Sequence, residues 1–188
     1  MGWLDGLSIY LAGPVDNVQS GEDWRAKYNN SLKVLGLKIY NPMVKPDWIS
    51  ELARVKKIDE STVIDMNNGI YDKSASAADE VRSVCLSMVS HSDIILCYLP
   101  KIFTIGTIDE LFKADEQLKP IIFIFEPKGI VSLYAAGLFN RHIVSSSFEN
   151  ALNLLNDINE QGFQYFVDNK IDDLENRYRW LPLTHKAL

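Results

Sequence analysis

The chain has 188 residues, of which 47% are hydrophobic and 23% charged, and its formal net charge is −6. This length suffices for one α/β domain with a full core, and this composition excludes a disordered chain. The negative charge and the lack of a basic block argue against general binding to nucleic acid polymers or acidic membranes.

The N-terminus and the cysteines bear on where the protein works. The opening MGWLDGLSIYLAG lacks a basic lead and a long apolar core, so we expect neither a signal peptide nor a membrane span. Cys85 and Cys97 are the only cysteines, and both lie in apolar patterns. This favours a reduced, cytoplasmic setting over a disulfide framework.

The first forty residues predict a strand, a helix and a strand. Leu7–Leu11 is the first strand, and it ends in the tight turn Ala12-Gly13-Pro14. A capping pattern at Ser20–Asp23 begins a helix that runs from about Glu22 to Leu35. Leu37–Tyr40 is the second strand, which completes a parallel unit.

The next segment is less regular until a helix at Ser76–Ser90. Asp47–Val55 predicts a short helix, and the polar stretch Asp65–Asp72 predicts a loop over the carboxyl ends of the strands, where binding residues concentrate. One face of the Ser76–Ser90 helix is apolar at helical spacing. Its members are Ala78, Val81, Val84, Cys85, Met88 and Val89.

The centre of the chain predicts a second parallel unit. Ile94–Leu99 and Ile121–Phe125 are short apolar runs typical of buried parallel strands. The helix between them opens at Gly106–Glu110, and the loop and helix start that follow a strand are where open α/β sheets bind ligands. Its expected inner side chains are Ile108, Leu111, Phe112 and Leu118.

The remaining chain predicts three more elements. They are a short helix at Val131–Leu138, a strand at His142–Val144, and a helix from Phe148 to about Ile158 that Ser146-x-x-Glu149 caps. We expect residues 1–160 to form one α/β domain. Residues 161–188 form a C-terminal extension that packs on this domain or on a neighbouring subunit.

Familiar cofactor and metal motifs do not occur. The sequence has no GxGxxG, GxxxxGK[ST], HExxH or CxxC, and His91, His142 and His185 lie in different predicted elements. We therefore expect no metal and no cofactor. Cys85 and Cys97 have a simple interpretation as small buried hydrophobic residues.

Glu110 has two interpretations. Thr107-Ile-Asp-Glu110 matches a capping box, in which Thr107 caps the helix and Glu110 folds back onto the cap. Alternatively, the carboxylate attacks an electrophilic sugar carbon or supports an oxocarbenium-like centre. Gly106 would let a ligand approach the backbone, and the helix N-terminus can hold an anion.

An ordered set of motifs over roughly residues 8–145 resembles the nucleoside 2-deoxyribosyltransferase family. The motifs are Ile9-Tyr10-Leu11-Ala12-Gly13-Pro14, Trp24-Arg25, Leu35-Gly36 with Tyr40-Asn41-Pro42, Ser92-Asp93-Ile94-Ile95-Leu96, and Gly106-Thr107-x-x-Glu110-Leu111 with Ala114 and Lys119-Pro120. The resemblance implies a single Rossmann-like (flavodoxin-like) domain, with a central parallel sheet flanked by helices. It also implies cleavage of an N-glycosidic bond, with Glu110 as nucleophile and Tyr10 orienting it.

The expected substrate contacts lie around the same strand ends. They are Gly13, Asp16, Arg25, Asp65, Gly106, Thr107 and Asn140. For Asp16 and Arg25, a surface salt bridge is the alternative. Tyr10 has the alternative of packing in the core.

Two positions depart from the family pattern. Thr104 stands where the family usually has an Asp before the nucleophile, and Cys85 stands where it often has an Asp on the preceding helix. Asp65, Asp72 or Asp79 would be a replacement acid, unless each is simply a solvated charge. If Cys85 occupies the acid position, its side chain should face the same cavity as Glu110.

Two other functions stay open. The Gly106–Phe112 stretch also resembles the cytokinin-activating phosphoribohydrolases, although Phe103-Thr104-Ile105 replace their small residues. A nucleoside 5′-monophosphate N-glycosidase would hold its phosphate on the Ala12–Pro14 turn or at Gly106–Thr107. A non-catalytic nucleotide-binding module is the third possibility. The partner in each case is a small nucleoside or nucleotide, and the resemblance implies a homo-oligomer.

Overall fold

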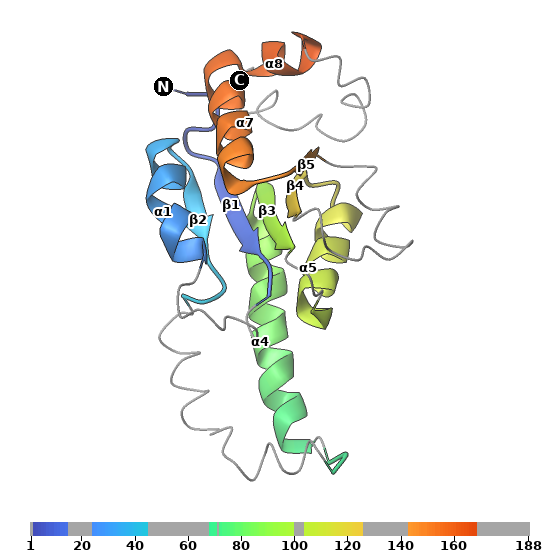
Figure 1. Cartoon of the computed structure of the whole chain (residues 1–188). Helices are drawn as coiled ribbons and strands as arrows, with labels where there is room; N and C mark the ends of the chain where they lie inside the picture. The colour runs from blue at the N-terminus through green and yellow to red at the C-terminus, as the bar shows by residue number, and fades with distance from the viewer. Residues whose placement is uncertain are drawn as a thin grey trace.

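The strands of the protein lie side by side in one parallel sheet. The computed structural model describes residues 2–14, 24–44, 68–70, 72–99, 104–125 and 143–168. Within these ranges the sheet is five-stranded, with the order β2-β1-β3-β4-β5 (Figure 1). The strands are β1 (Ser8–Ala12), β2 (Lys38–Tyr40), β3 (Ile94–Leu99), β4 (Ile121–Phe125) and β5 (Ile143–Ser145).

Helices cover both faces of this sheet. They are α1 (Trp24–Val34), α4 (Asp72–His91), α5 (Ile105–Glu116), α7 (Phe148–Gln161) and the short α8 (Phe163–Asp168). Side chains of α1 and α7 pack in one core cluster with alternate strand residues such as Leu11 and Leu96. Side chains of α4 and α5 pack in the other, with Tyr10 and Cys97. The flanked parallel sheet and its flavodoxin-like order confirm the predicted fold class.

Helix α4 is longer than the sequence indicates. It begins at Asp72 rather than Ser76, and Figure 1 shows its N-terminal part extending past the arrowheads of the strands. The predicted apolar face is buried only where the helix packs on the sheet. Val89 is fully buried, whereas Ala78 on the same apolar face is exposed.

Helix α5 is rotated relative to its predicted orientation. Its buried residues are Thr107, Glu110, Leu111 and Ala114. Ile108, Phe112 and Leu118 are exposed, against the prediction. The apolar residues alone indicate the wrong face because the inner face of the helix includes a threonine and a glutamate. Leu118 lies beyond the helix, in a turn with positive φ.

The last long helix begins at Phe148 as predicted, but its capping residue differs from the predicted one. The side chain of Ser147, not of Ser146, accepts a hydrogen bond from the Asn150 N–H at 3.1 Å. The helix continues past Ile158 and ends at Gln161, where Gly162 has a φ of 59°. None of the described helices is both long and apolar enough to span a bilayer.

Several predicted features lie outside the described residues. They are the cap at Ser20–Asp23, the helices at Asp47–Val55 and Val131–Leu138, most of the Asp65–Asp72 loop, and the end of the C-terminal extension.

Candidate functional site

The candidate site lies where the strand order reverses, between β1 and β3. These two strands are neighbours in the sheet, with Tyr10 beside Ile95 and Ala12 beside Cys97. The helix after β1 packs on one face, and the helix after β3 packs on the other. Such a switch point leaves a crevice at the carboxyl ends of the strands, where α/β proteins bind ligands.

A tyrosine and a glutamate meet beside this switch point. The Tyr10 hydroxyl donates a hydrogen bond to Glu110 Oε1 at 2.6 Å. Tyr10 is fully buried in β1, and Glu110 keeps 9% of its surface exposed. A buried carboxylate that accepts a short hydrogen bond from a phenol is held in one orientation.

The capping-box interpretation of Glu110 is wrong. The N-cap of α5 is Thr104, whose Oγ1 accepts from the Thr107 N–H at 3.3 Å. Thr107 itself lies inside the first turn, so Glu110 is too far along the helix to fold back onto the cap. Thr104, which stands where the family usually has an Asp, is therefore the N-cap of this helix.

Burial changes the acidity of both partners. It raises the pKa of the Glu110 carboxyl to about 7, and the negative charge of Asp109 adds to this increase. The hydrogen bond from Tyr10, the charge of Arg25 and the Cys85 side chain act in the opposite direction. The pKa of Tyr10 is raised, first by burial and then by the nearby Glu110. Glu110 therefore exchanges its proton close to neutral pH.

Cys85 is the third side chain of this cluster. It lies on α4, is half-buried, and comes within hydrogen-bonding reach of Glu110 and Tyr10, so that it affects the pKa of each. Cys85 therefore lies next to Glu110, and the shared cavity stays a prediction. Cys97, on β3, is fully buried in the core, and burial raises the pKa of its thiol.

Arg25 and Gly13 shape the turn after β1. Arg25 is fully buried, with its Nε donating to the Leu11 carbonyl at 3.0 Å and Nη2 to the Gly13 carbonyl at 2.6 Å. The alternative of a surface salt bridge is therefore wrong for Arg25. Gly13 has a φ of 151°, and a Cβ there would lie 2.9 Å from the Tyr98 carbonyl oxygen. Only glycine fits this turn without strain.

The other predicted substrate contacts divide into two groups. Gly106 is exposed, and no atom lies within 4 Å of the place where its Cβ would stand. Thr107 is buried, with its hydroxyl 2.8 Å from that of Thr104. Asp16, Asp65 and Asn140 lie outside the described residues. Asp79, which the sequence offers as a replacement for the missing family acid, is exposed on α4. A substrate-binding role for the predicted contacts stays a prediction.

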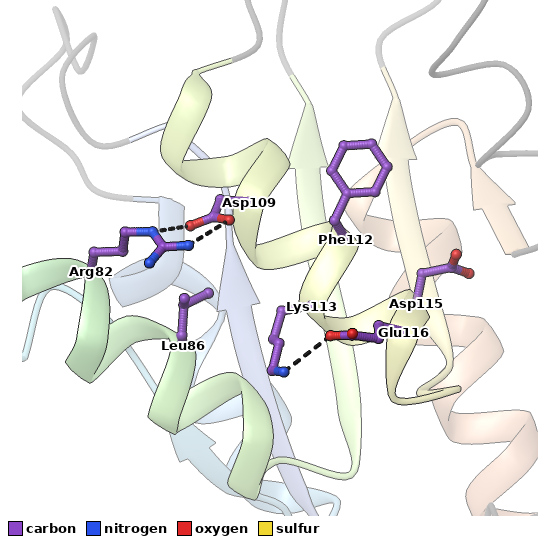
Figure 2. A pocket seen from close by; sticks show the side chains of 7 residues that line it. All are labelled: Arg82, Leu86, Asp109, Phe112, Lys113, Asp115 and Glu116. Atoms are coloured by element: carbon purple, nitrogen blue, oxygen red, sulfur yellow. Dashed lines mark hydrogen bonds and ion pairs between the residues drawn. The ribbon is translucent and has the colours of Figure 1, made fainter. Parts of the chain in front are cut away.

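A surface groove of about 540 Å³ runs between α4 and α5, and Figure 2 shows the side chains that line it. Arg82 spans it, with Nε and Nη2 donating to the Asp109 carboxylate at 2.5 and 3.1 Å. Neither Glu110 nor Tyr10 lines this groove. Sequence reasoning missed this ion pair because nothing in the pattern places two charges from separate helices opposite one another.

Metal ligands do not gather in the described part of the chain, where no three His, Cys, Asp or Glu side chains could hold one ion together.

Two solved structures are among those that match this chain. A CMP N-glycosidase from Clostridium botulinum aligns at 13% identity, with 79% of this chain and 98% of that chain covered and a TM-score of 0.48. A 2-deoxyribosyltransferase from Leishmania mexicana aligns at 19% identity, covering 86% and 97%, with a TM-score of 0.45. No protein-family model and no curated protein sequence matches the chain. At these values neither alignment assigns an activity, so the function has to come from the chain's own residues.

Proposed function

We propose that the protein cleaves the N-glycosidic bond of a nucleoside or deoxynucleoside and transfers the sugar to another base or to water. The observation that carries this proposal is the buried Tyr10–Glu110 pair, joined at 2.6 Å beside the switch point. Glu110 is shielded from bulk water, fixed in direction and able to ionise near neutral pH. These are the properties of a carboxylate that acts as a nucleophile.

The reaction has two steps. In the first, a Glu110 oxygen forms a bond to the anomeric carbon as the bond from that carbon to the base nitrogen breaks. The base leaves with the electron pair and takes up a proton. In the second, a nitrogen of another base, or water, attacks the same carbon, releases the carboxylate and loses its own proton. Tyr10 keeps its proton throughout and holds the carboxylate in line, because its raised pKa prevents ionisation.

The substrate in this proposal is a small molecule that enters from the carboxyl ends of β1 and β3. The turn at Gly13 and the helix start at Gly106 and Thr107 supply backbone N–H groups for its sugar or phosphate. The roles of Arg25, Asp16, Asp65 and Asn140 as substrate contacts belong to the same proposal. The homo-oligomeric state and the cytoplasmic location are also part of this proposal.

The decisive experiment replaces Glu110 by Gln. Glu110→Gln keeps the size of the side chain and an acceptor for the Tyr10 hydroxyl, but removes the nucleophilic charge. We expect turnover of deoxynucleosides to fall by roughly 10³-fold or more, as removal of a covalent nucleophile usually causes. The matched control is Glu116→Gln on the exposed end of the same helix, where the side chain pairs with Lys113. It should keep full activity.

Product analysis separates the candidate activities. Incubation with a deoxynucleoside and a second free base should give the exchanged nucleoside, and release of base in water alone would indicate hydrolysis. The same assay with nucleoside 5′-monophosphates tests the nucleotide alternative. A folded Glu110→Gln protein with wild-type turnover would eliminate Glu110 as the nucleophile. Binding of nucleosides without turnover by the wild type would exclude a catalytic function and favour the non-catalytic binding module.

A trapped intermediate identifies the nucleophile directly. A fluorine at the 2-position of the sugar slows breakdown of a glycosyl-enzyme because it destabilises the oxocarbenium-like transition state. Mass spectrometry of the digested protein should find the sugar on the peptide that contains Glu110. Sugar on any other carboxylate would contradict the assignment.

A further inference from the structure

Cys85 contacts both members of the Tyr10–Glu110 pair from a separate helix. Tyr10 belongs to β1 and Glu110 to α5, and α4 brings the Cys85 side chain within hydrogen-bonding reach of both. The three groups therefore come from three elements and close one small polar cluster. Core residues surround it, including the fully buried Leu111 and Cys97.

Contacts of two other α4 residues, one on each side of Cys85, hold this part of the helix in position. One turn toward the C-terminus, Val89 is fully buried in the core under the sheet. One turn toward the N-terminus, Arg82 makes its two-pronged pair with Asp109, the residue next to Glu110 (Figure 2). A bidentate pair of this kind restricts the geometry more than a single contact does. The register of α4 against α5, and with it the distance from Cys85 to Glu110, is thus set from both sides.

We propose that Cys85 is a positioning residue, which together with Tyr10 holds the Glu110 carboxylate in place for attack on the sugar. This inference rests on the proposed function of Glu110. Cys85 forms no bond to the substrate in this proposal. Its thiol and the Tyr10 hydroxyl belong to different elements of the fold and act on the same carboxylate, which limits the rotation of that carboxylate.

The groups around Glu110 indicate what the loss of Cys85 would do. Tyr10 from β1, Arg25 from α1 and Cys85 from α4 favour the ionised carboxylate. Burial and Asp109 from α5 oppose it, and Cys97 from β3 is a further near neighbour. Removing the Cys85 hydrogen bond leaves burial less compensated, so Glu110 should take up its proton at a higher pH.

The test compares Cys85→Ala with Cys85→Ser. Alanine removes the hydrogen bond, and serine restores a donor of similar size. For kcat/KM between pH 5 and 9, we expect Cys85→Ala to move the acidic limb upward by roughly half a unit to one unit. At pH 6 this equals about a 3- to 10-fold loss of rate, which recovers at high pH. Cys85→Ser should restore the wild-type profile or shift it to lower pH. Ser83→Ala, on the exposed side of α4, is the control and should change nothing.

A second readout does not need turnover. Carbon-13 NMR of labelled glutamate side chains, with Glu110→Gln to assign the signal, follows the titration of Glu110 directly. The midpoint should rise in Cys85→Ala and return in Cys85→Ser. This pattern supports positioning even if no nucleoside is turned over, in which case only the proposed function fails. Equal midpoints in wild type, Ala and Ser variants would overturn the inference, as would a Ser variant that behaves like Ala. If the Ala variant does not fold, Cys85→Val replaces it, because valine also removes the hydrogen bond while keeping most of the side-chain volume. A wild-type midpoint in that variant would contradict a hydrogen bond from residue 85.

Discussion

Glu110 lies where a carboxylate is least stable as an ion. Its neighbours in the core include Leu111, Ala114 and Tyr10, all fully or almost fully buried. A carboxylate there is kept only because hydrogen bonds and the buried Arg25 offset part of the desolvation. An ion in such a place lowers stability, and this cost is one reason why we propose a functional role for Glu110.

The stability of the protein should therefore depend on pH through Glu110. Its pKa is about 7 in the folded protein against an ordinary value of 4.5, so the folded state holds the proton more tightly than the unfolded state. The free energy of unfolding should then fall as pH rises from about 4.5 to about 7, by up to about 3 kcal/mol. Glu110→Gln lacks this titration, so it should gain that amount relative to the wild type across the window. Urea unfolding of both proteins at several pH values measures the difference.

The control for this prediction is again Glu116→Gln, because Glu116 is exposed and should leave the pH dependence unchanged. Parallel stability curves for the wild type and Glu110→Gln would mean that Glu110 titrates alike in the folded and unfolded states, and would contradict the prediction.

At the scale of elements, the turn after β1 and the start of α5 use glycine for different reasons. Gly13 is required by the protein itself, because its φ is 151° and the Tyr98 carbonyl oxygen approaches the place of a Cβ. Gly106 has no such requirement, because the space around it is open and α5 would accept alanine there. An open glycine near the switch point is what close approach of a ligand would need.

Replacing each glycine by alanine should distinguish a backbone requirement at Gly13 from ligand access at Gly106. Gly13→Ala should lower stability by roughly 1–3 kcal/mol through backbone strain and the clash. Gly106→Ala should raise stability by about 0.5–1 kcal/mol, because alanine favours the helix. If the substrate contacts this backbone, Gly106→Ala should nevertheless raise KM several-fold. Thermal melting and steady-state kinetics on both variants provide the test, and an unchanged KM would remove Gly106 from the substrate contacts.

At the scale of the whole molecule, the sequence predicts that the last residues hold subunits together. Tyr178, Trp180, Leu181 and Leu183 make the end of the chain apolar, although it lies outside the described residues. Such a segment gains stability by covering apolar surface on a partner. We expect at least a dimer at micromolar concentration, and a lower mass after deletion of residues 177–188.

Light scattering on the full chain and on the shortened chain measures this. A monomeric full chain would refute the predicted oligomer. An unchanged mass after the deletion would show that subunits meet elsewhere, and the same samples assayed for turnover would show whether assembly matters for activity.

Residue patterns by themselves determined the sheet and its centre. The apolar runs of β3 and β4 hold their predicted bounds, because strands buried on both faces must be apolar along their whole length. Tyr10 and Glu110 were also singled out from the sequence, through the motifs around them.

Only the tertiary structure decided which groups surround Tyr10 and Glu110. The spacing of Thr107 and Glu110 allowed a helix cap as well as a nucleophile, and periodicity placed Ile108 and Phe112 on the inner side, because a pattern rule treats a polar residue as exposed. The fold reverses this, since the Tyr10 hydroxyl, 100 residues away in the chain, donates a hydrogen bond to Glu110, and the charge of Arg25 helps to compensate the burial of the carboxylate. The contacts of Cys85 and the pairing of Arg82 with Asp109 have the same origin, because side chains on separate helices meet only after the sheet has set the helices side by side.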